Sequence, residues 1–310
     1  MVSMPNIRKA AVAGGFYPRF AKEITETLKE NFENPQFGIG KPIEIGSKLI
    51  GDRKIIGGVC PHAGHVYSSA CASHTIQALC KESFPDTVII FGNTHTGYRD
   101  IATMQEGAWE TPLGKIEIDT EITNAIIDGK NVIADDSAFM GYPHGREHNI
   151  EVQIPILQYV AQIAKKPLKI VPIVIGRMNI PDLEVTGAYL AQKLQLFHGK
   201  KDIVIIASSD MTHHEPKNYN NPKEDIAWQH KKDQAVMDAF VEMNHQKTFE
   251  KAAETTVCGP QTITLLMVTA KKMGYSKSHQ LKYYTSYERM GAEGPCEYSV
   301  GYFSGIIFKD

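Results

Sequence analysis

The sequence predicts an α/β fold: a single three-layer α/β/α domain over residues 1–310, built around a central mixed, mostly parallel sheet. Apolar runs of strand length, such as residues 203–207, are typical of strands buried on both faces. These runs alternate with helical segments along the chain, as in βαβ units. No linker, repeat or low-complexity tract divides the sequence. Short strands around residues 101–119 and two late strands indicate that the sheet is mixed.

Apolar runs and alternating patterns define the expected strands. They cover residues 54–60, 87–92, 101–104, 114–119, 169–175, 201–208, 282–286 and 297–308. Pro172 lies inside one of these strands and has no N–H to donate to a neighbour. That strand is therefore expected at an edge of the sheet or at a bulge.

Helical spacing of apolar residues defines the expected helices. They cover residues 20–32, 67–81, 120–128, 147–164, 181–197, 222–244 and 261–272. The helix over 147–164 is expected to be interrupted near Pro155. Loops are expected at 8–18, where Gly14 and Gly15 allow close backbone approach, at 106–113 and at 140–148.

Composition excludes several classes of function. The net charge of −2 gives no electrostatic reason to expect nucleic acid or an anionic membrane as a partner. No apolar run approaches the ~20 residues that span a bilayer, and the N-terminus has no apolar core of a signal peptide. The five cysteines form no CxxC pair, and their odd number favours free thiols in a reducing compartment. We expect a cytoplasmic protein of enzyme size.

Three of the expected strands lead directly into histidines. The strand over 54–60 is followed by His62 and His65, the strand over 87–92 by His95, and the strand over 201–208 by Asp210, His213 and His214. In open α/β sheets, ligands bind outside the carboxyl ends of the strands. The sequence therefore predicts a site at this edge. Taken singly, His62 or His65 could instead cap a helix or bind a carbonyl.

Cys258 is the most informative cysteine, because it precedes Gly259-Pro260 and a helical run. The positive end of a helix dipole favours the thiolate, which is both a nucleophile and a metal ligand. The alternative is a small buried residue at a tight turn. The other cysteines, at positions 60, 71 and 80, fall in apolar or helical settings that indicate packing, and Cys296 stays open.

If His62, His95 and Cys258 converge, their donor atoms suit a single metal ion with a position left open for water or substrate. Such a donor set suits Fe(II), Cu or Zn. His213 would then be a general base beside the metal, oriented by Asp210. The alternative role for Asp210 is to cap the segment that begins near Met211.

Glu147, His148 and Glu151 form an EHxxE pattern at the start of an expected helix. Glu147 and Glu151 are one turn apart and would share a helix face. The pattern is not the HExxH of a zinc helix, and a charged, capped helix start explains it equally well. The role of these three residues stays open at this point.

The ordered motifs together resemble the Memo family, the proteins related to the mediator of ErbB2-driven cell motility. The resemblance covers about residues 8–304 and is carried by AVAGGFYP, PHAGHVYS, GNTHTG, WETPLGKIEID, EHNIEVQIPILQY, VPIVIG, SSDMTHH, CGPQTI and VGYFS. It implies a fold similar to class III non-haem iron extradiol dioxygenases. It also implies a site for iron or copper at His62, His95 and Cys258, with His213 and Asp210 adjacent, and an oxidase or other redox role.

The sequence departs from the ring-cleaving relatives at the third ligand, where they use glutamate and this chain has Cys258. Extradiol cleavage therefore does not carry over, because a thiolate changes the redox potential of the site. We expect a metal-dependent redox enzyme acting on an unidentified small molecule. One alternative is a non-catalytic module that binds a peptide or other ligand in a cleft lined by Phe16, Tyr67 and Trp109. Another is a cysteine hydrolase with Cys258 as nucleophile and His213 as base.

Overall fold

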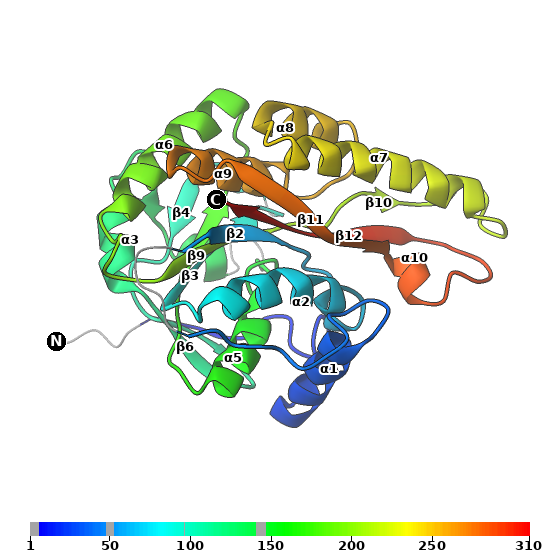
Figure 1. The fold of residues 1–310 in the computed structure, drawn as a ribbon, viewed down its shortest axis with the longest axis horizontal. Helices are drawn as coiled ribbons and strands as arrows, with labels where there is room; N and C mark the ends of the chain where they lie inside the picture. The colour runs from blue at the N-terminus through cyan, green and yellow to red at the C-terminus, as the bar shows by residue number, and fades with distance from the viewer. Residues whose placement is uncertain (1–5, 48–52, 96, 141–146) are drawn as a thin grey trace.

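The computed structural model describes residues 6–47, 53–95, 97–140 and 147–310. Within these residues the strands form a twelve-stranded sheet, with the order β1-β5-β6-β8-β3-β9-β2-β12-β10 along its main path. Helices cover both faces of this sheet (Figure 1). The expected α/β fold, with helices flanking a mixed and mostly parallel sheet, is confirmed.

The strands range from two residues in β1, β7 and β10 to ten in β12. They are β1 (Ile7–Arg8), β2 (Ile55–Cys60), β3 (Thr87–Asn93), β4 (Ile101–Thr103), β5 (Ala108–Thr111), β6 (Gly114–Ile118), β7 (Ile133–Ala134), β8 (Lys169–Ile175), β9 (Ile203–Ser208), β10 (His213–His214), β11 (Lys277–Thr285) and β12 (Ser299–Phe308). The central neighbours β8, β3, β9 and β2 are all parallel. Their carboxyl ends therefore meet at one edge of the sheet.

The helices divide between the two faces. They are α1 (Ala21–Glu33), α2 (His65–Glu82), α3 (Thr120–Ile126), α4 (Ser137–Met140), α5 (Gln153–Ala164), α6 (Ile180–Gln195), α7 (Lys223–Val241), α8 (His245–Ala253), α9 (Pro260–Lys272) and α10 (Ser286–Arg289). In Figure 1, α1, α2 and α5 lie on one side of the sheet, and α6, α8 and α9 on the other.

The core has two halves because side chains alternate across the sheet. In β3, Val88 and Ile90 join the apolar cluster under α1, α2 and α5. Ile89 and Phe91 join the cluster under α6 and α9. This double burial explains the continuous apolar run in the sequence, which an exposed face would have interrupted with polar residues.

The position of Pro172 corrects one expectation. Strand β8 is not at an edge, since it pairs with β3 on one side and with β6 and β4 on the other. The β6 pairing ends at Ile170 and the β4 pairing begins at Ile173, so Pro172 lies in the gap between them. The Pro172 carbonyl accepts a hydrogen bond from Thr103 Oγ1 of β4. Because the N–H and C=O of one strand residue point to the same side, the missing N–H of Pro172 also lies on the side of this gap.

Other elements also differ from expectation. The expected loop over 106–113 contains β5, which pairs with β1 and β6. The helix expected from residue 147 begins only at Gln153, so that Pro155 lies in its first turn, where a missing N–H is tolerated. Helix α8 was not expected at all. Residues 141–146 of the loop expected at 140–148 lie outside the described residues.

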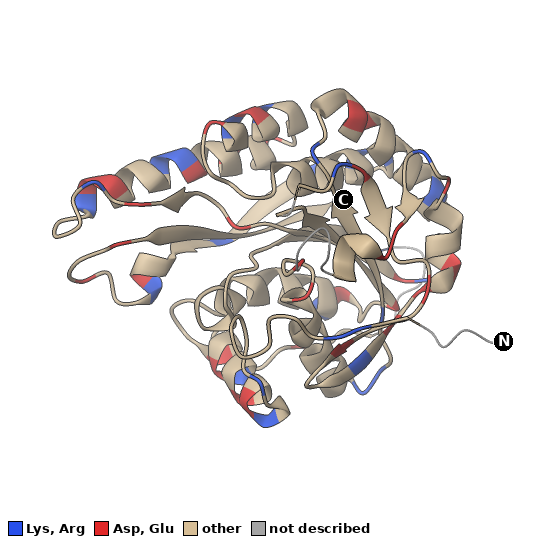
Figure 2. Cartoon of the chain, turned by 180° about the vertical axis from the view of Figure 1, so that it is seen from behind, with Lys and Arg blue, Asp and Glu red and all other residues tan. Residues whose placement is uncertain are grey.

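Helix α7, the strands β10 and β12, and α10 together extend beyond the rest of the molecule (Figure 1). Lys or Arg positions and Asp or Glu positions occur together along α7, without a segment of one sign (Figure 2). Among the described residues, no helix has the length and apolar character needed to cross a bilayer.

Candidate metal centre

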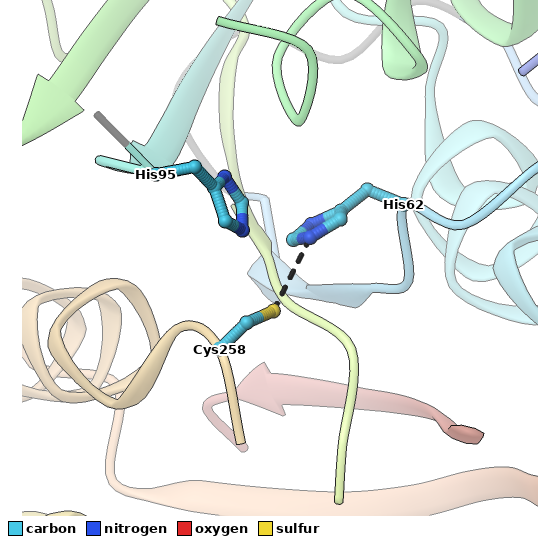
Figure 3. Close-up of side chains that lie close together, drawn as sticks. All are labelled: His62, His95 and Cys258. Atoms are coloured by element: carbon cyan, nitrogen blue, oxygen red, sulfur yellow. Dashed lines mark hydrogen bonds between the residues drawn. The ribbon is translucent and has the colours of Figure 1, made fainter. Parts of the chain in front are cut away.

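The ends of two strands and the start of one helix bring His62, His95 and Cys258 together. His62 follows β2 and His95 follows β3, which are both hydrogen-bonded to β9. Cys258 comes from the turn before α9. One potential ligand atom from each residue lies within 4.8 Å of the other two (Figure 3). A single ion would therefore need only small side-chain adjustments to contact all three.

His62 is the most buried of the three, with 2% of its surface exposed. Its Nε2 lies 3.2 Å from Cys258 Sγ, and its Nδ1 lies 3.1 Å from Ser208 Oγ on the opposite side of the ring. Burial, and then the neighbouring histidines, lower the pKa of His62 well below its usual value. The imidazole is therefore neutral at neutral pH, the form that binds metals.

Cys258 is partly buried, and its sulfur accepts a hydrogen bond from the Asp210 backbone N–H at 3.2 Å. Burial and the Asp210 carboxylate raise the pKa of the thiol. In the absence of a metal, burial thus opposes the thiolate that the start of α9 was expected to favour. A bound cation would reverse the balance, since a coordinating thiol loses its proton.

His95 is the exposed member of the set. Its Nδ1 lies 3.1 Å from Asn149 Nδ2, which leaves Nε2 for the shared site. The Asn149 amide also donates to the Asn93 carbonyl, and the Asn93 amide donates to the Cys258 carbonyl. The turn carrying His95 is thus joined to the turn carrying Cys258.

His148 is the site residue whose role the sequence left open. Its ring stacks on that of His95, with centroids 4.6 Å apart, and lies 5.9 Å from the ring of His62. Phe16 packs on it from the N-terminal loop, with a centroid distance of 4.7 Å. The EHxxE pattern was the one available signal, but it was interpreted on a helix, whereas His148 lies in the turns before α5.

The two glutamates of that pattern point away from the site into structural roles. Glu147 accepts a hydrogen bond from the Ile150 N–H at 3.1 Å. Glu151 forms a buried ion pair with Arg8 and accepts from the Ala11 N–H and the Tyr17 hydroxyl. Glu151 therefore holds the N-terminal loop in place, and Phe16 of that loop packs against His148.

Asp210 reaches the site, but with a different partner from the one expected. Its Oδ1 accepts hydrogen bonds from the backbone N–H groups of His62, at 2.7 Å, and Ala63, at 3.3 Å. Its Oδ2 lies 4.0 Å from His62 Nε2. Burial raises the pKa of Asp210 to about 7. Asp210 therefore holds the His62 turn in place, and the expected contact with His213 gives way to this one.

His213 and His214 point in opposite directions, as expected for neighbours in extended backbone. His213 Nδ1 lies 2.8 Å from the Tyr298 hydroxyl and its ring faces the site cavity. His214 Nε2 lies 3.3 Å from Asp225 on α7. Burial lowers the pKa of His213, so that it is neutral at neutral pH. His65 is buried against the Val152 carbonyl, the structural role considered for it.

A cavity of about 920 Å³ opens beside two of the candidate ligands, His62 and His95. Phe16 and Tyr67 line it, as the binding-module hypothesis expected, together with Met290 and Tyr298. Trp109 does not, because it is buried in the core under the Arg8 guanidinium. The loop after α10, which provides Tyr298, was not recognised as part of the site from its sequence.

Comparison with known proteins identifies the family. The family model described as "Memo-like protein" matches residues 8–306. The chain belongs to the Memo family. A "MEMO1 family protein" of Desulfurococcus amylolyticus is 34% identical, covering 95% of this chain and 96% of its own. One from Methanobrevibacter smithii is also 34% identical, covering 97% and 99%.

A further "MEMO1 family protein", from Nitrosopumilus maritimus, is 33% identical and covers 92% of this chain and 94% of its own. Among solved structures, an uncharacterized protein of Escherichia coli K12 aligns with 83% of this chain and 100% of its own, at 9% identity and a TM-score of 0.46. This likeness is too weak to carry an argument. Family membership is thus shown by sequence.

Proposed function

We propose that this Memo-family chain is a metal-dependent redox enzyme of the oxidase or oxygenase type. His62, His95 and Cys258 would hold one ion of Fe(II) or Cu, with Zn as a further option. The observation that carries the proposal is the approach of one ligand atom from each residue to within 4.8 Å of the others. The substrate would be a small molecule held in the adjoining cavity of about 920 Å³.

The chemistry of the donors fits this assignment. Two imidazoles and a sulfur suit iron, copper or zinc and not the oxygen-preferring Mg²⁺ or Ca²⁺. A redox-active ion bound there would supply one-electron chemistry and a position for a small ligand. The chain around it supplies partners for the rings, since Ser208 and Asn149 contact the nitrogens that face away from the site.

His213 would be the residue that moves a proton. Its Nδ1 contacts the Tyr298 hydroxyl, which fixes the ring, while its Nε2 is buried and has no hydrogen-bond partner among the described residues. A neutral imidazole with a free nitrogen at a cavity wall can accept a proton from a bound ligand or donate one to it. Phe16 and Tyr67 would hold the apolar body of that ligand.

The competing proposal is a non-catalytic module that binds a peptide or small ligand in the same cavity. The volume and aromatic lining of the cavity support this reading. The cysteine-hydrolase hypothesis has less support. Cys258 Sγ is closest to His62 and not to the expected base His213, and burial raises the pKa of the thiol, which opposes the nucleophilic form.

Elemental analysis of untagged protein tests the proposal. We expect about one equivalent of iron, copper or zinc per chain after purification without added metal. His62→Ala and Cys258→Ala should each lose the metal. His198→Ala, which removes an exposed histidine after α6 that is not a candidate ligand, should retain it. Wild-type protein that carries no metal and binds none on titration would overturn the metal proposal in favour of the binding module.

A further inference from the structure

Two hydrogen-bond arrangements lie behind the candidate metal-binding rings, one at His62 and one at His95. We propose that Ser208 and Asn149 hold these imidazoles in opposite tautomers, so that His62 is ready to bind a metal whereas Asn149 must yield before His95 can do so. The part of this inference that concerns metal binding rests on the proposed function. Its first test, however, concerns the metal-free protein alone.

The tautomer of His62 follows from the bonds of Ser208. The Ser208 hydroxyl has one hydrogen, and it donates that hydrogen to the Asn149 backbone carbonyl at 2.7 Å. It accepts from Gln153 Nε2 at 2.9 Å, an amide nitrogen fixed by its second bond to the Pro61 carbonyl. Towards His62, Ser208 can therefore only accept. His62 carries its hydrogen on Nδ1, and its Nε2 lone pair faces Cys258.

The tautomer of His95 follows from the side chain of Asn149. The Asn93 carbonyl can only accept, so the Asn149 atom that contacts it is the amide nitrogen. The same Nδ2 lies 3.1 Å from His95 Nδ1, which must then be the acceptor. A neutral His95 therefore carries its hydrogen on Nε2, the nitrogen that faces the shared site (Figure 3).

Metal binding through His95 Nε2 requires the ring hydrogen to leave Nε2 and a hydrogen to be placed on Nδ1. The ring gains no net charge in this exchange. An N–H on Nδ1 would oppose the Asn149 amide nitrogen, so the amide would have to turn. Asn149 Oδ1 is buried and has no hydrogen-bond partner among the described residues, and after the turn it would accept from Nδ1. This turn of the amide would break the hydrogen bond that Asn149 Nδ2 donates to the Asn93 carbonyl oxygen.

The two positioning residues should therefore act on metal affinity with opposite signs. Ser208 supports the metal-binding tautomer of His62, as outer partners of ligand histidines do. Asn149 supports the wrong tautomer of His95 and opposes binding. If both residues merely maintained the shape of the site, removing either side chain would weaken affinity.

The first experiment is ¹⁵N NMR of the histidines in metal-free protein, with assignments from His62→Ala and His95→Ala. We expect the Nδ1–H tautomer at His62 and the Nε2–H tautomer at His95. Ser208→Ala should release His62 into a mixture of tautomers. Finding the same tautomer at both rings, or no change at His62 in Ser208→Ala, would overturn the inference. This readout does not depend on metal, so it separates failure of the inference from failure of the proposed function.

The second experiment measures Zn²⁺ affinity by competition with a chromophoric chelator. Ser208→Ala should weaken binding by about tenfold, whereas Asn149→Ala should strengthen it. Ser73→Ala is the matched control, a fully buried serine in α2 whose hydroxyl bonds within its own helix, and should leave affinity unchanged. Weakening by both Ser208→Ala and Asn149→Ala would overturn the inference. Should Asn149→Ala not fold, the wild-type NMR spectrum decides it.

Discussion

The buried ion pair between Arg8 and Glu151 ties the N-terminal loop to the turns that carry His148. Arg8 is 3% exposed and Glu151 is 1% exposed. The Glu151 carboxylate also accepts from the Tyr17 hydroxyl at 2.6 Å and from the Ala11 N–H at 2.9 Å. Glu151→Ala would remove all of these acceptors at once. We predict that it is among the most destabilising single substitutions near the site.

The magnitude follows from what remains after the change. Breaking a buried pair by removing one partner costs about 3–5 kcal/mol, because the other charge stays buried and unpaired. The Tyr17 hydroxyl would add about 1 kcal/mol or more as an unsatisfied buried donor. Lys9→Ala provides the matched control, since Lys9 pairs with Glu110 in a largely exposed position and should cost below about 1 kcal/mol.

Urea unfolding measures both changes through the midpoint and slope of the transition. The double variant Arg8→Met with Glu151→Leu should recover much of the loss, because it removes both charges together. A cost below about 1 kcal/mol for Glu151→Ala, equal to that of Lys9→Ala, would refute the view that this pair anchors the loop.

Three further predictions concern single positions. Burial raises the pKa of Glu147 to about 7, so its contribution to stability is present below pH ~4 and is lost as pH rises through 7. Wild type should lose about 3 kcal/mol relative to Glu147→Gln between pH 4 and pH 8 in urea unfolding, and equal pH profiles would contradict this. Gly92→Ala should lower the midpoint of urea unfolding, because its Cβ would lie 2.3 Å from Asn149 Oδ1, whereas Gly64→Ala, with no atom closer than 3.5 Å, should not, and equal midpoints for the two variants would contradict this. Trp109→Ala should cost about 3–5 kcal/mol in urea without changing metal content, and loss of metal would show that Trp109 serves the site after all.

Much of the fold could be predicted because burial on both faces of a strand leaves a clear signal. The central strands β3 and β9 appear in the sequence as unbroken apolar runs, and their order with the helices predicts the sheet. Pro172 was misjudged because its tolerance depends on where β6 stops pairing and β4 starts. That gap is a property of two other strands, and nothing near Pro172 encodes it.

The candidate site could be predicted only in part, for a similar reason. The three candidate ligands lie beside strand ends or a helix start, and these can be located from the local sequence pattern. They are His62, His95 and Cys258. The position of His148 depends on Phe16, more than a hundred residues earlier, and on turns where a helix was expected. The partner of Asp210 is a pair of backbone N–H groups, which no side-chain pattern reveals.

The most direct test of the metal centre is X-ray absorption at the metal edge of the loaded protein. We expect one sulfur at about 2.3 Å and imidazole nitrogens at about 2.0–2.1 Å, with the sulfur absent in Cys258→Ala. A wild-type spectrum with only nitrogen and oxygen neighbours, unchanged by Cys258→Ala, would contradict the assignment.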